Sequence, residues 1–285
     1  MQVVHIIGGG FAGVEAAWQL ARAGVPCVLR EMKPVRFSAA HKSAALAELV
    51  CSNSFKAERT ASAAGLLKEE MRRLGSLCVE VAQAVRVPAG GALAVDRDAF
   101  AAEITRRVTA EPLITLRREE AKEIPAEGMV IVAAGPLASE AITESIAKIC
   151  GAGLHFYDAA APIVTAESVD MRHAFPASRY DRGGEDDYLN CPLNREEYAH
   201  FEQALLGAER AHTHDFDVYE GCMPIEVLAS RGRDAIRFGP MKPVGLENPA
   251  TGKRPWAVVQ LRQDNRLNTL FNMVGFQTRL KWSEQ

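Results

Sequence analysis

Several signatures that would restrict the class of this protein are missing from its sequence. The six cysteines are widely spaced and include no CxxC pair, which argues against a disulfide framework or a zinc ribbon. No apolar run approaches the roughly 18 residues of a membrane span, and no basic flank precedes the short apolar run in MQVVHIIGGG. We therefore expect an N-terminal strand rather than a signal peptide, no membrane association, and a cytoplasmic protein with reduced thiols.

The histidines give little support for a metal-binding protein, and the net charge gives little support for a nucleic-acid-binding protein. Among seven histidines, the pair His212 and His214 is close in sequence but lacks the further ligands of a metal site, so we expect no bound metal. The net charge of −3 does not favour nucleic acid. From Arg231 onward, however, ten lysine and arginine residues stand against four acidic ones. This local excess suits a polyanionic partner, and it also suits an ordinary solvated surface.

The first 31 residues have the pattern of a β-α-β unit. Residues 3–7 form a short β-branched apolar run, and a glycine-rich turn follows at once. Apolar residues then recur at helical spacing over residues 14–23, and Gly24 ends the helix. Residues 25–30 form the next strand, which closes on Glu31.

The rest of the chain changes character near residue 153. Before it, one helix is expected over residues 62–74 and another after Pro136, ending near residue 150. Strands are expected at 113–116 and 129–133. Beyond it, short extended runs alternate with loops rich in proline and glycine and with one helix, 195–206; the runs at 257–261 and 270–274 could form a hairpin. We predict an α/β fold with a Rossmann-like dinucleotide domain (1–152) and a second, more β-rich domain (153–285).

The glycine-rich turn matches G-x-G-x-x-G at Gly8, Gly10 and Gly13. These glycines allow a tight turn, close approach of a pyrophosphate, and close packing of helix on strand, while the helix N-terminus favours phosphate. Glu31 stands where a carboxylate accepts ribose hydroxyls. We expect FAD rather than NAD, because the unit is N-terminal and a later strand ends in Ala-Gly-Pro. The candidate cofactor residues are Gly8, Gly9, Gly10, Phe11, Ala12, Gly13 and Glu31.

Two cysteines occupy turns rather than apolar segments. Cys222 precedes a short helical pattern that begins near Pro224 and ends near Gly232, and a helix N-terminus stabilises a thiolate. Cys51 follows an apolar run and precedes three turn-forming residues, Ser-Asn-Ser. From the pattern alone, each is either a reactive thiol or a packed one.

The chain strongly resembles the folate- and FAD-dependent tRNA (uracil-5-)-methyltransferases. The matching segments cover nearly its whole length. They include GGGFAGVEAA, AELVCSNSFK, GLLKEEMRRLGSL, VPAGGALAVDRDAF, SRYDRGGEDDYLNCPLN, EGCMPIEVLASRG, FGPMKPVGL and NMVGFQTRLKW.

The resemblance implies an enzyme that makes ribothymidine in the tRNA T-loop. The carbon would come from 5,10-methylenetetrahydrofolate, and FAD reduced by NAD(P)H would supply the reducing equivalents. The functional thiols of the family fall on Cys222 and Cys51. A thiolate that adds to uracil C6 activates C5 as a nucleophile; we assign this role to Cys222, with Cys51 as its partner or general base. The β-rich part would be an insertion domain.

The sequence also departs from the family pattern. The family continues past LKWSEQ with a segment that returns to the FAD domain and completes it, so we expect the flavin domain of this chain to be incomplete. Phe37-Ser38-Ala39-Ala40 replaces a usual Thr-Pro-Ala run, and Ala134 a common threonine. Three alternatives remain: an FAD oxidoreductase with a redox cysteine pair, an inactive tRNA-binding remnant, and the same chemistry on ribosomal RNA. The sequence does not predict the oligomeric state.

Overall fold

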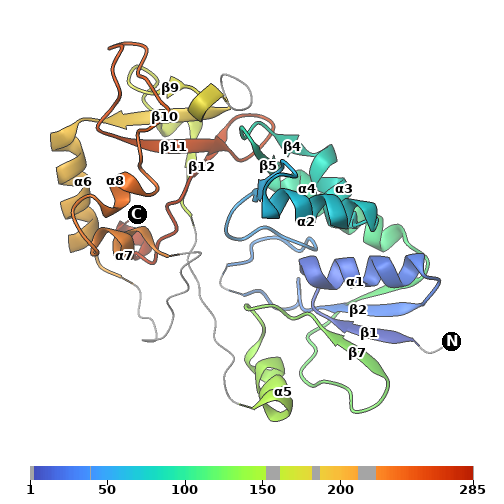
Figure 1. The fold of residues 1–285 in the computed structure, drawn as a ribbon. Coiled ribbons are helices and arrows are strands. Elements are labelled where there is room, and N and C mark those ends of the chain that lie inside the picture. The colour runs from blue at the N-terminus through green and yellow to red at the C-terminus, as the bar shows by residue number, and fades with distance from the viewer. Residues whose placement is uncertain (1–2, 39, 152–160, 182–186, 211–222, 285) are drawn as a thin grey trace. The chain divides into compact units, whose positions relative to one another are not determined.

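The computed structural model describes residues 3–38, 40–151, 161–181, 187–210 and 223–284, and the chain forms two compact units. Unit 1 comprises residues 1–50, 60–85 and 97–156, and unit 2 comprises residues 51–59, 86–96 and 157–285. Figure 1 follows the chain through both. The predicted domain boundary between residues 152 and 153 stays a prediction. The two compact units differ from it, because residues 51–59 and 86–96 group with the later residues.

Unit 1 contains a four-stranded parallel sheet, in which β1 and β2 are the strands expected from the β-α-β pattern. Most residues in β1 and β2 are β-branched or apolar, and both strands are largely buried, as expected for the interior of a parallel sheet. The strand order is β6(Ile114–Arg118), β2(Cys27–Glu31), β1(Val4–Ile7) and β7(Met129–Val132).

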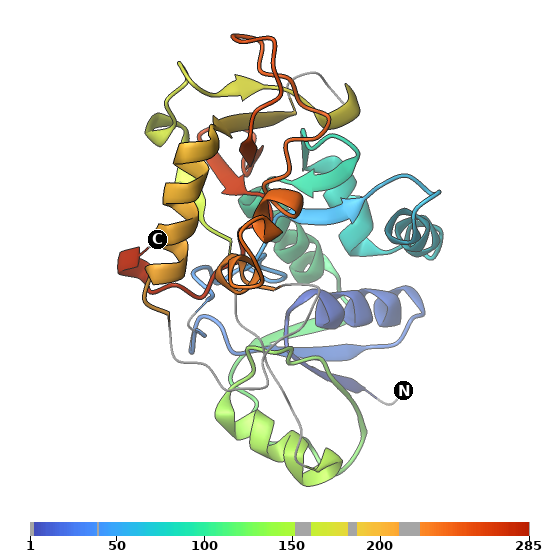
Figure 2. The ribbon, with the colours of Figure 1, turned by 60° about the vertical axis from the view of Figure 1, so that its left-hand side comes forward.

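Helices lie on both sides of this sheet. On one face, α1(Phe11–Arg22) contacts α3(Leu77–Ala84) and α4(Arg97–Ala110). Helix α5(Glu140–Cys150) lies on the other side of the strands from α1, as Figures 1 and 2 show. The predicted helix over 62–74 is confirmed as α2(Ala63–Arg73), and its N-cap Ser62 accepts from the Gly65 amide.

Unit 2 is built on antiparallel strands. Its larger sheet has the order β8(Ile163–Thr165), β12(Leu270–Met273), β11(Ala257–Gln263), β10(Tyr188–Leu193) and β9(Phe175–Pro176). Strands β11 and β12 pair as the expected hairpin. A smaller sheet has the order β3(Ser54–Ala57), β5(Ala92–Val95) and β4(Arg86–Val87). Hydrogen bonds from Asn53 Nδ2 to the Gln263 carbonyl and from the Tyr188 hydroxyl to the Ala89 carbonyl connect these segments to the larger sheet. The predicted α/β fold with a more β-rich second part is confirmed.

Short helices pack against the larger sheet of unit 2. The longest, α6(Arg195–Gly207), starts with a capping box formed by Asn194 and Glu197. Its apolar face joins α7(Ile225–Ala229) and α8(Ala235–Phe238) in a core that includes Tyr198, Ile236, Met241 and Phe276. Single 3₁₀ turns occur at Ala166–Ser168, Arg179–Asp181 and Trp282–Glu284. In the described part of the chain, no helix has the length and apolar character needed to cross a membrane.

Burial separates the cysteines of unit 1. Cys27 in β2 and Cys78 in α3 are buried, whereas Cys150 at the end of α5 is exposed. Burial, and secondarily the charge of Glu111, raises the pKa of the Cys27 thiol to about 11. Burial also raises the pKa of Cys78, with a further contribution from Glu15. Both therefore pack as small hydrophobic residues.

This difference predicts selective alkylation of the native protein. Because the thiolate is the nucleophile, iodoacetamide at pH 8 is expected to modify Cys150 and to leave Cys27 and Cys78 unmodified. A pKa of about 11 instead of 9.0 lowers the thiolate fraction of Cys27 roughly a hundredfold, before its inaccessibility is counted. Peptide mass spectrometry measures the rates. Equal rates for Cys27 and Cys150 in the folded protein would contradict this assignment, and equal rates are expected in denaturant.

Candidate dinucleotide site and thiols

In the turn between β1 and α1, Gly8 packs against the backbone of Ala133, and Gly13 packs against the backbone of Gly8. The Gly8 amide donates to the Arg30 carbonyl at 2.8 Å, and the Ala133 amide donates to the Ile7 carbonyl at 2.8 Å, so the turn is held between β2 and the end of β7. A Cβ on Gly8 would lie 2.4 Å from the Ala133 oxygen, and a Cβ on Gly13 would lie 1.8 Å from the Gly8 oxygen. Both positions therefore require glycine for packing.

Gly10 differs from these two glycines, because it faces open space. Apart from its own chain neighbours, no atom of the described residues lies within 4 Å of a Cβ built there. Gly10 is also the N-cap of α1, and the first turn of that helix contains no acidic residue. A helix N-terminus without a capping side chain leaves amide groups and the positive end of the macrodipole available to an anion.

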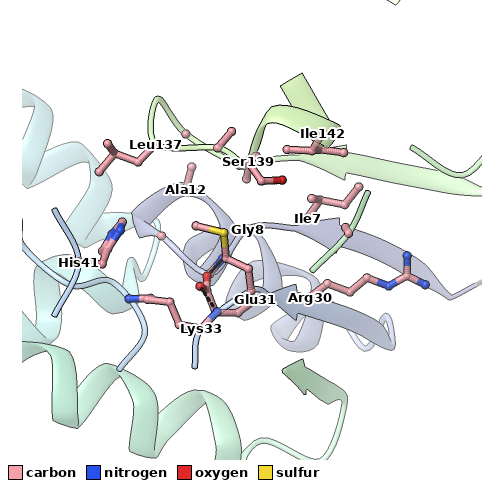
Figure 3. A pocket seen from close by; sticks show the side chains of 18 of the residues that line it. Ile7, Gly8, Ala12, Arg30, Glu31, Lys33, His41, Leu137, Ser139 and Ile142 are labelled. Atoms are coloured by element: carbon pink, nitrogen blue, oxygen red, sulfur yellow. Dashed lines mark hydrogen bonds between the residues drawn. The ribbon is translucent and has the colours of Figure 1, made fainter. Parts of the chain in front are cut away.

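The open side of Gly10 belongs to a pocket of about 340 Å³, within the usual size range of ligand pockets. Six of the seven candidate cofactor residues line it, and Gly13 instead lies beneath the turn. Figure 3 shows Glu31 between Arg30 and Lys33, with Leu137, Ser139 and Ile142 across from them. The structure thus brings the predicted residues together around one cavity, and their role in binding stays a prediction.

Glu31 is buried and organises the turn as well as facing the pocket. One carboxylate oxygen accepts from the Gly9 amide at 2.7 Å, and the other accepts from the Lys33 amide at 3.0 Å. Each carboxylate oxygen has two lone-pair sites, so both can accept another donor. The side chain can therefore hold the glycine-rich turn and take ribose hydroxyls at the same time.

The sequence pattern missed three polar residues of the loop after β2. Lys33, which is 3% exposed, donates from Nζ to the Ala45 carbonyl at 2.7 Å and to Glu48 at 3.0 Å. The other oxygen of Glu48 accepts from two loop amides. His41 lines the same pocket, and burial followed by the charge of Lys33 lowers its pKa. No motif marks these residues, because they lie in an irregular loop that the Lys33–Glu48 ion pair shapes.

Of the two candidate thiols, the structure describes Cys51 alone. Cys51 is half-buried in unit 2 and lies at the turn that leads into β3. Cys222 and the histidine pair lie outside the described residues. The predicted helix after Cys222 is confirmed as the short α7, and its buried Glu226 accepts from Thr278 Oγ1 at 3.0 Å and from the Arg279 amide at 2.9 Å. These bonds fix the segment that follows Cys222.

Comparison with known proteins identifies the family of the chain. The family described as glucose inhibited division protein A matches residues 3–285. The chain belongs to this family. Structures of Aquifex aeolicus GidA in two crystal forms match 99% of the chain with TM-scores of 0.67 and 0.69, at 11% and 13% identity. The matched region is 51% and 53% of the length of these GidA chains. The two structures show the fold that this chain shares with them.

Among curated members, the similarity is much higher. The chain is 59% identical to the methylenetetrahydrofolate–tRNA-(uracil-5-)-methyltransferase TrmFO of Geobacter sulfurreducens and 60% identical to that of Moorella thermoacetica. Each match covers 99% of this chain. The chain spans 66% and 65% of the length of these relatives. The resemblance predicted from the sequence segments is confirmed, including the shorter length of this chain.

Metal binding finds no support in the described residues. Within them, no group of three or more histidine, cysteine, aspartate or glutamate side chains is arranged to hold an ion. The pocket chemistry of unit 1 is instead that of a glycine-rich turn, a helix N-terminus and a carboxylate, which suits a phosphate- and ribose-containing ligand.

Alanine substitution at the two kinds of glycine should affect two different properties, stability at Gly13 and ligand affinity at Gly10. Gly13→Ala should lower the free energy of unfolding by about 3 kcal/mol, because the added methyl group overlaps the Gly8 carbonyl. Gly10→Ala should change it by less than about 0.5 kcal/mol, yet weaken ADP binding about tenfold, because the methyl group enters the phosphate-facing space. Urea denaturation and calorimetric titration measure the two effects. Unchanged ADP affinity in Gly10→Ala would refute the assignment of the pocket.

Proposed function

We propose that the chain performs folate-dependent methylation of uridine C5 in the T-loop of tRNA. The observation that carries this proposal is the identity of 59–60% over 99% of the chain to relatives named as tRNA (uracil-5-)-methyltransferases. The carbon donor is 5,10-methylenetetrahydrofolate, and the reductant is FAD, itself reduced by NAD(P)H. Since the chain spans about two thirds of these relatives, their activity and substrates are proposed for it.

The pocket of unit 1 fits the dinucleotide part of FAD. The turn at Gly8–Gly10 and the N-terminus of α1 would hold the pyrophosphate, with Phe11 and Ala12 supplying the first helical residues. The free lone pairs of Glu31 would accept the ribose hydroxyls. When bound, FAD supplies the electrons that convert the transferred methylene group to a methyl group.

The thiols supply the covalent chemistry. Uracil C5 is a weak nucleophile, so the Cys222 thiolate adds to C6 and gives an enolate whose C5 bonds to the folate methylene carbon. A base then takes the C5 proton as the bond between the methylene carbon and the folate nitrogen breaks, which releases tetrahydrofolate and leaves an exocyclic methylene on C5. Addition of a hydride equivalent to this carbon, which the reduced cofactor would supply, gives the methyl group as the bond between sulfur and C6 breaks and the uracil ring and the thiolate are restored. We assign the base role to Cys51. The target uridine must leave its stack, and the basic residues from Arg231 onward would contact RNA phosphates.

An adduct with 5-fluorouracil-containing tRNA tests the nucleophile. Fluorine at C5 cannot leave as a proton does, so the bond between sulfur and C6 persists and retards the protein in a denaturing gel. The wild-type chain, supplied with the folate donor, FAD and NADPH, is expected to form the adduct. Cys222→Ser should abolish it, because serine is not ionised at neutral pH. Cys150→Ser, which removes an exposed thiol of unit 1, should leave adduct formation unchanged.

The same assay separates the alternative functions. An adduct that survives in Cys222→Ser contradicts the nucleophile assignment. Rapid NADPH oxidation without RNA or folate, together with no adduct, favours a flavin oxidoreductase with a cysteine pair. Binding of tRNA without bound flavin or adduct favours a non-catalytic RNA-binding protein. An adduct with a fluorouracil-containing ribosomal RNA fragment, and none with tRNA, moves the substrate to ribosomal RNA.

A further inference from the structure

A buried arginine lies in the middle of unit 2. Arg262, on β11, is 5% exposed. Removing a guanidinium from water carries a large desolvation cost, and replacing buried ionic groups with apolar residues is often neutral or stabilising. A buried arginine is therefore weak evidence for stability and directs attention to the groups that it holds.

The Arg262 guanidinium reaches the turn that follows Cys51. Its Nε donates to Asn53 Oδ1 at 2.9 Å, and its Nη2 donates to Ser52 Oγ at 2.8 Å and to Asn272 Oδ1 at 3.2 Å. The rigid fork of an arginine can bond in two directions at once, whereas the single ammonium of a lysine cannot reproduce this geometry. One side chain thus holds both residues that come directly after the thiol.

Asn53 extends this contact to the strands of both sheets in unit 2. It is fully buried, and its Nδ2 donates to the carbonyls of Val95 and Gln263, each at 2.9 Å. Its oxygen accepts from Arg262. The amide group therefore ties the turn to the last residue of β5 and to the last residue of β11.

Fixing these two residues restricts the thiol that precedes them. The backbone of Ser52 and Asn53 is bonded covalently to Cys51, so immobilising them limits the directions in which the half-buried cysteine side chain can point. A proton-transferring or nucleophilic thiol must lie within hydrogen-bond reach of its substrate, and small displacements lower the rate steeply. A requirement for one fixed orientation of the Cys51 side chain explains why the guanidinium is buried despite its desolvation cost.

We propose that Arg262 is a positioning residue that fixes the orientation of the Cys51 thiol through Ser52 and Asn53. It does not touch substrate; it acts through the turn. This inference rests on the proposed function, in which Cys51 is the partner thiol of the methylation reaction. It adds to that function a residue far from the thiol in sequence and close to it in unit 2.

Site-specific alkylation of the purified 285-residue chain tests the positioning role. Arg262→Ala should raise the iodoacetamide rate of Cys51 about tenfold relative to Cys150 in the same molecule, because loss of the charged hydrogen bonds lets the turn open. Gln263→Ala is the matched control: it lies next to Arg262 on β11, and its side chain bonds to the Asn265 carbonyl instead of the turn. That variant should alkylate as the wild type does.

Chemical rescue separates positioning from a general loss of stability. Millimolar guanidinium, which fits the space left by the arginine head group, should restore slow alkylation of Cys51 in Arg262→Ala. Arg262→Lys keeps the charge and should be rescued less, because the lysine side chain itself fills the space that the added guanidinium would enter. If Arg262→Ala does not fold, Ser52→Ala removes one acceptor and should still raise the Cys51 rate about threefold.

Two results would overturn the inference. One is an unchanged ratio of Cys51 to Cys150 alkylation in the folded Arg262 and Ser52 variants. The other is an equal rise at Cys51 and at the buried Cys27 and Cys78 that guanidinium does not reverse, which indicates loss of global stability. The assay uses no RNA, folate or flavin, so its outcome is distinct from that of the fluorouracil adduct.

Discussion

The candidate dinucleotide pocket depends on the close approach of Gly13 to the carbonyl of Gly8. A Cβ at position 13 would lie 1.8 Å from that oxygen, so α1 can approach β1 this closely because position 13 carries no side chain. The close approach aims the N-terminus of α1 at the end of the strand. There it meets Glu31, whose carboxylate accepts from the Gly9 amide. The amides at the start of α1 and the carboxylate of Glu31 thus take their relative positions from one steric constraint.

Buried charges fix the loops of this protein rather than its core. The Lys33–Glu48 pair shapes the loop after β2, Glu226 ties α7 to residues 278–279, and Arg262 holds the turn at Ser52. An ion pair such as Lys33–Glu48 adds little net stability, because desolvation offsets its attraction, but removing one partner costs about 3–5 kcal/mol. Charged groups in these places therefore select one loop conformation among several. Apolar packing alone would leave the irregular backbone less defined.

The local parts of the fold could be predicted from sequence, and the non-local parts could not. The β-α-β unit, the helix capped by Ser62 and the hairpin of β11 and β12 each follow from periodicity and cap residues within one short window. The grouping of residues 51–59 with unit 2 depends on pairing of β3 with β5 and on the bond between Arg262 and Asn53. That bond spans 209 residues, and no periodicity or turn signal records it.

The same limit applies to the candidate site. The glycine spacing and Glu31 predicted where a dinucleotide would bind, since each residue type has a fixed mechanical task in that turn. Cysteine has no such task, and its role depends on its surroundings. Cys27 and Cys51 both follow apolar residues in sequence, yet Cys27 packs inside a parallel sheet while Cys51 lies half-buried beside a turn held by a distant guanidinium. What distinguishes a packed thiol from a positioned one is thus a tertiary contact, and the side chain that makes this contact is informative about function.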